Sequence, residues 1–218
     1  MMIFVLVYML AAMRYVRSKN LVVAKFIYYL VVTKFDMVEG KIADICAPTL
    51  AGFKCGSLFR TEEPLEALSE SISEVNAELN PLGVTVEAFV PSGCGTLVYV
   101  YRNDLLQRIS SDERSLRLLE ELGYDVTSTS VIVGQLKERV ESAGCVPHEI
   151  GFFLGYPYED VLGFMNDRGR CPKCSGCWKV YGSVERANRM FASIHRCRKA
   201  YRARFMSGTS LVELTVSM

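Results

Sequence analysis

Two side chains in this sequence are of the types that nucleophilic catalysis needs. Cys46 stands two residues before Pro48, at the start of a run that favours a helix, and His148 is one of only two histidines. A thiol at a helix N-terminus has its thiolate stabilised by the helix dipole, and a nearby imidazole activates it further. Cys46 and His148 are therefore candidate catalytic residues. The alternative is that Cys46 is a small core residue and that His148 caps the end of an element.

The order of these two residues is that of papain-like proteins, in which a cysteine opens an early helix and a histidine opens a later strand. In that plan a third polar residue orients the imidazole. The segment "GCWKVYG" with the serine after it offers only Lys179, Tyr181 or Ser183 for this role, whereas Glu149 and Asp160 are carboxylates. Glu149 is therefore the third candidate catalytic residue.

A second group of candidate residues lies in "CPKCSGCW", where Cys171, Cys174 and Cys177 follow a C-x2-C-x2-C spacing. Three thiolates on one short loop can reach a common centre, and Cys197 or His195 would supply the fourth ligand of a zinc or iron–sulfur site. Eight cysteines in 218 residues are too few for a disulfide scaffold, which indicates reduced thiols and a cytoplasmic protein.

A basic run near the C-terminus is the only indication of nucleic-acid binding. The net charge is +1, so the whole molecule has no strong field that would attract nucleic acid or anionic lipid. A solvated face of an amphipathic helix explains the run equally well. The sequence contains no P-loop, no dinucleotide-binding glycine motif and no H-E-x-x-H motif. The basic residues are Arg186, Arg189, Arg196, Arg198, Lys199, Arg202 and Arg204.

The pattern of elements predicts an α+β fold in a single domain over residues 37–218. The sequence predicts a helix that begins near Pro48 and further helices near 65–79, 114–124 and 131–144, with Gly123 and Gly144 as C-caps. The segments 84–90 and 96–102 indicate an antiparallel hairpin, and 149–155 and 177–182 indicate two later strands. A short helix is expected to begin at Pro157 and a last one after Ser183, with its apolar residues facing inward. Those residues are Val184, Ala187, Met190, Phe191, Ile194 and Tyr201.

The first 36 residues differ in composition from the rest. They hold five basic residues and one acid, and their two apolar runs are shorter than a membrane span requires. We expect this hydrophobic and basic extension to be translated upstream sequence before a start at Met37. The alternative is association of residues 3–32 with a membrane.

Three blocks carry a resemblance to a known family. The segments "CAPTLAGFKCGSLF", "PHEIGFFLGYPYEDVLGF" and "GCWKVYG", in this order and joined by "LVYVYR", resemble domain of unknown function 3793 over residues 38–212. The resemblance implies a cytosolic bacterial protein and no known activity. Cys55 stands where the family usually has proline, and the loop of Cys171 and Cys174 is not reliably rich in cysteine. A function that rests on those three residues therefore has less support.

Three hypotheses follow. The first is a thiol-dependent protein of acyl-transfer or peptidase type, with Cys46 and His148 lining one cleft and Lys54, Glu149 and Trp178 beside them. The second is a non-catalytic metal-thiolate or redox-linked adaptor that binds zinc or an iron–sulfur cluster. The third is a protein-interaction module without a catalytic site. The distance between Cys46 and His148 separates the first hypothesis from the others.

Overall fold

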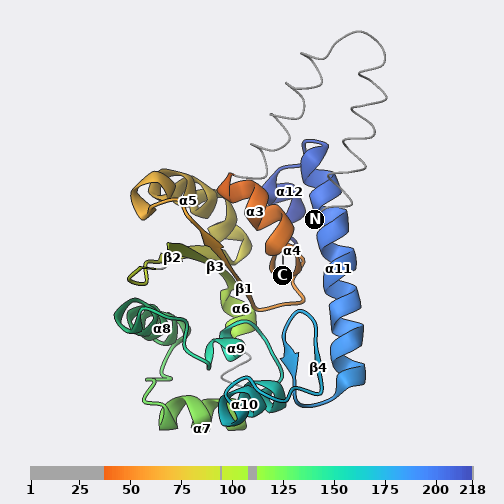
Figure 1. The fold of residues 1–218 in the computed structure, drawn as a ribbon. Coiled ribbons are helices and arrows are strands. Elements are labelled where there is room, and N and C mark those ends of the chain that lie inside the picture. Colours follow the sequence, from red (N-terminus) through yellow and green to blue (C-terminus); the bar gives the residue numbers. More distant parts are fainter. Residues whose placement is uncertain (1–36, 94, 108–111, 218) are drawn as a thin grey trace.

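The computed structural model describes residues 37–93, 95–107 and 112–217. Its centre is a three-stranded antiparallel sheet in the order β1-β3-β2 (Figure 1). The strands are β1 (Gly56–Thr61), β2 (Val84–Phe89) and β3 (Thr96–Arg102). Every residue of β3 is buried, because helices cover both faces of the sheet. A strand buried on both faces is apolar throughout, as "TLVYVY" is.

The residues of β3 alternate between two hydrophobic clusters, as the pleat of a strand requires. Leu97, Tyr99 and Tyr101 face the first cluster, whereas Val98 and Val100 face the second. The first cluster is completed by residues from α6 (Asn103–Leu106), α7 (Glu113–Glu121), α8 (Thr129–Ala143), α9 (Ile150–Phe153) and α10 (Tyr158–Asp167). The second is completed by residues from α3 (Val38–Ile45), α4 (Ala47–Leu50), α5 (Leu65–Leu79), α11 (Val184–Met206) and α12 (Leu211–Leu214).

Two short strands and the longest helix form the side of the molecule that is blue in Figure 1. The hairpin of β4 (Cys174–Ser175) and β5 (Lys179–Val180) packs on the first part of α11 through Val180, Ala187 and Phe191. The second part of α11 lies along α3 and α4. A single helix thus connects the hairpin with the N-terminal helices.

The polar end of β3 fixes the chain that precedes β1. The Arg102 side chain is fully buried, and its guanidinium donates to the carbonyls of Thr49 (2.7 Å), Leu50 (2.8 Å) and Val216 (2.5 Å). The Arg102 backbone N–H donates to the carbonyl of Cys55 at 2.9 Å. Both ends of the loop from Leu50 to Cys55 are therefore held to the same residue.

The outer edge of β2 is closed by a side chain of α5. Asn76 Nδ2 donates to the carbonyl of Val86 (2.8 Å), and Asn76 Oδ1 accepts from the Val86 N–H (2.8 Å). The side-chain amide makes the pair of bonds that the backbone of a neighbouring strand would make. The 3-10 turn η1 (Asn80–Leu82) then leads from α5 into β2.

The structure confirms the α+β class and most of the expected helices. Helix α5 has the predicted bounds, Gly144 ends α8 in a left-handed conformation (φ 65°), and α10 follows Pro157. The Ser183 side chain caps α11 as expected, by accepting from the Arg186 N–H. Within α11 the expectation for Met190 is wrong, because its side chain lies on the exposed face. Among the described helices, none is long and apolar enough to cross a membrane.

Two expectations are wrong, one for a strand and one for the length of a helix. The apolar run at 149–155 forms α9 instead of a strand, and the helix expected from Pro48 ends at Leu50, so that 56–61 is free to form β1. A short apolar run buried on every side does not distinguish a strand from a helix. The other late strand is confirmed only as β5, which pairs with β4 and not with the main sheet. His148 therefore precedes a helix, and the papain-like plan is wrong.

Candidate functional site

Cys46 is the N-cap of α4, as predicted, but its side chain has no solvent exposure. It lies in the second hydrophobic cluster, beside α3. Burial raises the pKa of the Cys46 thiol to about 12, and the positive charges of Lys54 and Arg198 offset only part of this effect. A thiol that keeps its proton at neutral pH is a poor nucleophile. The environment of Cys46 thus weighs against catalysis, although the proposed role stays a prediction.

His148 and Glu149 lie on the other side of the sheet. Val146 and Ile150, which flank them, pack against the first cluster, and the exposed His148 ring meets Phe164 edge-on at 5.1 Å between centroids. The buried Glu149 carboxylate accepts from the Tyr124 hydroxyl at 3.0 Å. The described part of the chain shows no hydrogen bond or ring contact between His148 and Cys46.

The thiols proposed as metal ligands do not converge. Cys171 is exposed, whereas Cys174 and Cys177 are half-buried and pack against the small cluster around Phe191. Cys197 is half-buried on α11, and burial raises the pKa of its thiol to about 11. In the described residues, no three histidine, cysteine, aspartate or glutamate side chains are placed to hold a metal ion. Zinc or iron–sulfur binding at Cys171, Cys174, Cys177 and Cys197 is thus not supported by the geometry.

Most of the residues that the structure does bring together come from the segments 46–59, 147–164 and 176–182. Their centre is the buried carboxylate of Asp160, in the first turn of α10. Asp160 Oδ2 accepts from Trp178 Nε1 at 2.8 Å, and Oδ1 accepts from the backbone N–H groups of Tyr181 (2.8 Å) and Gly182 (2.7 Å). Hydrogen bonds to an ionised acceptor are stronger than neutral ones. Asp160 therefore joins the second block to the third.

An aromatic stack continues from Trp178 in both directions. The Tyr156 ring is stacked on Trp178 with centroids 4.6 Å apart, and Phe191 of α11 meets the other side of Trp178 edge-on at 4.5 Å. The tryptophan is only half-buried. Its indole is therefore fixed by three partners and still reaches the surface.

Lys54 joins the first block to this stack. Its ammonium lies 5.4 Å from the centroid of the Tyr156 ring, and its side chain is half-buried. Burial lowers the pKa of Lys54, and the positive charge of Arg198 adds to that effect. Among the described residues, no carboxylate forms an ion pair or hydrogen bond with this ammonium. A partly buried cation that has a ring face but no carboxylate beside it in the described residues is incompletely compensated.

The second cation near this position is Arg198. Its guanidinium binds the buried Asp44 carboxylate at 3.3 and 3.2 Å, and Arg202 binds the same carboxylate. Asp44 is thus shared between two arginines, so its charge does not neutralise Lys54 as well. Two members of the basic run on α11 therefore serve to hold α3, which accounts for part of that run without nucleic acid.

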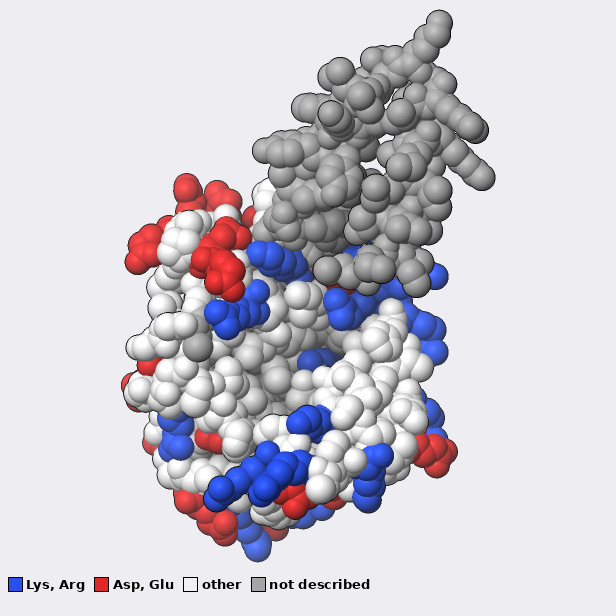
Figure 2. Space-filling model, in the orientation of Figure 1, with Lys and Arg blue, Asp and Glu red and all other residues white. Residues whose placement is uncertain are grey.

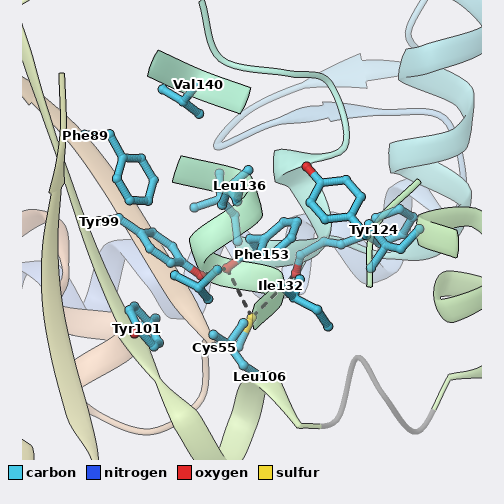
Figure 3. Close-up of a cluster of buried hydrophobic side chains, with 14 of the residues drawn as sticks. Cys55, Phe89, Tyr99, Tyr101, Leu106, Tyr124, Ile132, Leu136, Val140 and Phe153 are labelled. Carbon is cyan, nitrogen blue, oxygen red and sulfur yellow. Dashed lines mark hydrogen bonds between the residues drawn. The ribbon is translucent and has the colours of Figure 1, made fainter. Parts of the chain in front are cut away.

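The loop that carries Lys54 is anchored to the first cluster (Figure 3). Cys55 Sγ lies 3.5 Å from the carbonyl oxygen of Phe153, which also accepts from the Tyr99 hydroxyl at 2.8 Å. Burial raises the pKa of Cys55 to about 11, so the thiol stays a donor. Gly155 has φ 72°, and an added Cβ would lie 3.0 Å from Cys55 Sγ. This close packing fixes the backbone next to Lys54 and thereby the distance between its ammonium and the Tyr156 ring.

Figure 2 shows a hollow in the face between the loop that follows α4 and the β4–β5 hairpin, with blue side chains within and around it. Acidic side chains gather elsewhere on this face, chiefly over α5. We call the group of Lys54, Tyr156, Trp178 and Arg198 the Lys54 site. It presents one ammonium beside an aromatic wall.

The chain matches a family described as protein of unknown function, DUF3793, over residues 42–215. The chain belongs to this family. No curated protein and no solved structure matches it. The resemblance inferred from the three sequence blocks is thereby confirmed.

The DUF3793 match includes every residue of the Lys54 site. Lys54 and Trp178 were expected as neighbours in a cleft of Cys46 and His148; in the structure both contact Tyr156, Trp178 by stacking and Lys54 through its ammonium. The roles of Tyr156, Asp160 and Arg198 were missed. The sequence did contain a signal for Asp160. This acid lies in the first turn of a helix that follows a Gly-Tyr-Pro turn, where its carboxylate is able to accept hydrogen bonds from N–H groups of another segment. Nothing in the sequence indicated that Trp178 would be its partner.

Proposed function

We propose that this DUF3793 domain is a binding module for a small organic carboxylate, with the Lys54 ammonium as its ionic contact. The observation that carries the proposal is the half-buried ammonium of Lys54, which has no carboxylate partner in the described residues. A ligand carboxylate would provide the missing counter-charge in a partly desolvated place, where an ion pair is stronger than at the surface.

The walls of the Lys54 site favour an organic anion over an inorganic one. The Tyr156 ring lies next to the ammonium, and the Trp178 ring stacked on Tyr156 extends the apolar surface. Apolar groups of a ligand gain free energy when they cover such a surface. A carboxylate with a short apolar body satisfies both parts of the site.

Ligand binding is measurable through Trp178, the single tryptophan of the chain. Titration with lactate should change its fluorescence in a saturable way, and salt should weaken the effect because an ion pair is screened. In Lys54→Met the change should be lost, while in Lys137→Met, which alters a lysine on α8, it should remain. A wild-type protein that shows no saturable change would refute the proposal.

Two of the three hypotheses drawn from the sequence keep less support. A thiol-dependent reaction at Cys46 and His148 requires a thiolate, which burial of Cys46 disfavours. A metal-thiolate adaptor requires the loop of Cys171, Cys174 and Cys177 to rearrange. Metal analysis of protein purified without oxygen tests the second hypothesis directly.

A further inference from the structure

We propose that Lys54 is also an amine nucleophile, which forms an imine with the carbonyl group of a 2-oxo acid bound in the Lys54 site. This inference rests on the proposed function, because the carboxylate of the oxo acid is what the site binds. It adds a covalent step and names the substrate class.

The surroundings of Lys54 are those that make an amine reactive. An amine attacks a carbonyl only in its neutral form, and burial or a neighbouring cation favours that form. Lys54 has both, since it is half-buried and Arg198 lies near it. The lowering of its pKa agrees with this geometry. Arg198 also offers a second positive charge for the ligand carboxylate when Lys54 is neutral.

Two other lysines of the described chain, Lys41 and Lys179, differ from Lys54 because their ammonium groups have oxygen acceptors. Lys41 donates to Thr61 Oγ1 (3.0 Å) and lies 3.4 Å from a Glu63 carboxylate oxygen. Lys179 donates to the carbonyl of Gly169 at 2.7 Å. Each of these acceptors stabilises the ammonium form. In the described residues Lys54 has no such oxygen acceptor, and its ammonium lies 5.4 Å from the centroid of the Tyr156 ring, which attracts a cation more weakly.

The proposed step is balanced in atoms and charge. The Lys54 ammonium first loses a proton to water, and its nitrogen lone pair then adds to the carbonyl carbon of the oxo acid. The nitrogen releases one proton to water, and the carbonyl oxygen takes up two protons and leaves as water, so that a protonated carbon–nitrogen double bond, an iminium ion, remains. No oxidant or reductant takes part. A borohydride reagent added in the experiment delivers hydride to that carbon and makes the bond permanent.

The test uses the full chain, pyruvate and sodium cyanoborohydride, with peptide mass spectrometry to locate the product. We expect a carboxyethyl group on Lys54, formed severalfold faster than on Lys137. An excess of lactate should slow the labelling of Lys54 and leave Lys137 unchanged. Lys54→Arg keeps the positive charge and should bind lactate, but it should give no labelled peptide at this position.

The outcomes separate the inference from the proposed function. If lactate binds but Lys54 is labelled no faster than Lys137, the amine chemistry is refuted and the binding function stands. If lactate does not bind and Lys54 is not preferentially labelled, both fail. Labelling of Lys54 that lactate does not slow would also overturn the inference, because the reaction would then not take place in a carboxylate site.

Discussion

Replacing Asp160 by asparagine exchanges one heavy atom of the carboxylate that holds Trp178 of the Lys54 site. Asp160 Oδ1 accepts two backbone N–H groups and Oδ2 accepts Trp178 Nε1, all at 2.7–2.8 Å. An asparagine that keeps its oxygen on the backbone groups places an NH2 against the indole N–H, so two donors face each other. The flipped amide is worse, because its NH2 then faces two donors. The first orientation is therefore the one we expect.

The cost follows from these three bonds. A hydrogen bond to a charged acceptor contributes about 1.5–3 kcal/mol, and a neutral one about 1 kcal/mol. Asp160→Asn loses the bond to Trp178 and weakens the other two, so the free energy of unfolding should fall by about 3 kcal/mol. Asp160→Ala removes all three acceptors and should cost about 5 kcal/mol, a large part of the stability of a typical domain.

The assay is equilibrium unfolding in urea, followed by circular dichroism and by the fluorescence of Trp178. Glu159→Gln is the matched control, since Glu159 is the adjacent carboxylate and forms an exposed ion pair with Arg114 at 2.9 Å. Such a pair contributes less than about 1 kcal/mol. If Asp160→Asn is no less stable than Glu159→Gln, or if the Trp178 emission of the folded variant is unchanged, the reasoning is wrong.

Three further predictions concern single residues. Burial lowers the pKa of Lys54, so the folded protein loses the ammonium proton at a lower pH than the unfolded chain. The destabilising effect of the buried charge therefore decreases as the pH rises, and the free energy of unfolding increases up to the ordinary lysine pKa of 10.5. Lys54→Met should therefore be about 1 kcal/mol more stable than wild type at pH 7 in urea unfolding, with the difference shrinking toward pH 10.5; a pH-independent difference would contradict this. Gly163→Ala places a Cβ 2.4 Å from Tyr181 Cβ and should lower stability by about 2 kcal/mol, measured by thermal unfolding with the exposed Gly134→Ala as control. Iodoacetamide at pH 7 should label the exposed Cys171 before Cys46, and peptide mapping that finds Cys46 labelled first would restore its candidacy as a nucleophile.

The sequence predicted the elements whose signals are local. Helix α5 has apolar spacing along its length, and Ser183 and Gly144 mark the ends of their helices through their own backbone chemistry. The run at 149–155 has no such signal, because its residues are buried whether it forms a strand or a helix. The tertiary packing of the run, with Phe152, Phe153 and Leu154 in the first cluster, decides between them.

The candidate site was predictable only in its residue types. Cys46 and His148 are of the types that catalysis uses, but the sheet separates their surroundings, and no spacing along the chain could show that. The residue type of Lys54 does not by itself indicate a binding site, because lysine is common at protein surfaces. The position of Lys54 depends on its loop, which Arg102 and Cys55 hold in place through contacts with segments that are distant in the sequence.

The clamp of Asn76 on β2 has a consequence for the behaviour of the protein in a crowded cell. A free strand edge is a template on which another chain can add a strand, and such pairing leads to aggregates. The amide of Asn76 occupies the N–H and carbonyl of Val86 in the middle of that edge. Self-association by strand addition must first break both bonds and displace α5, so a single side chain helps to keep neighbouring copies of the domain apart.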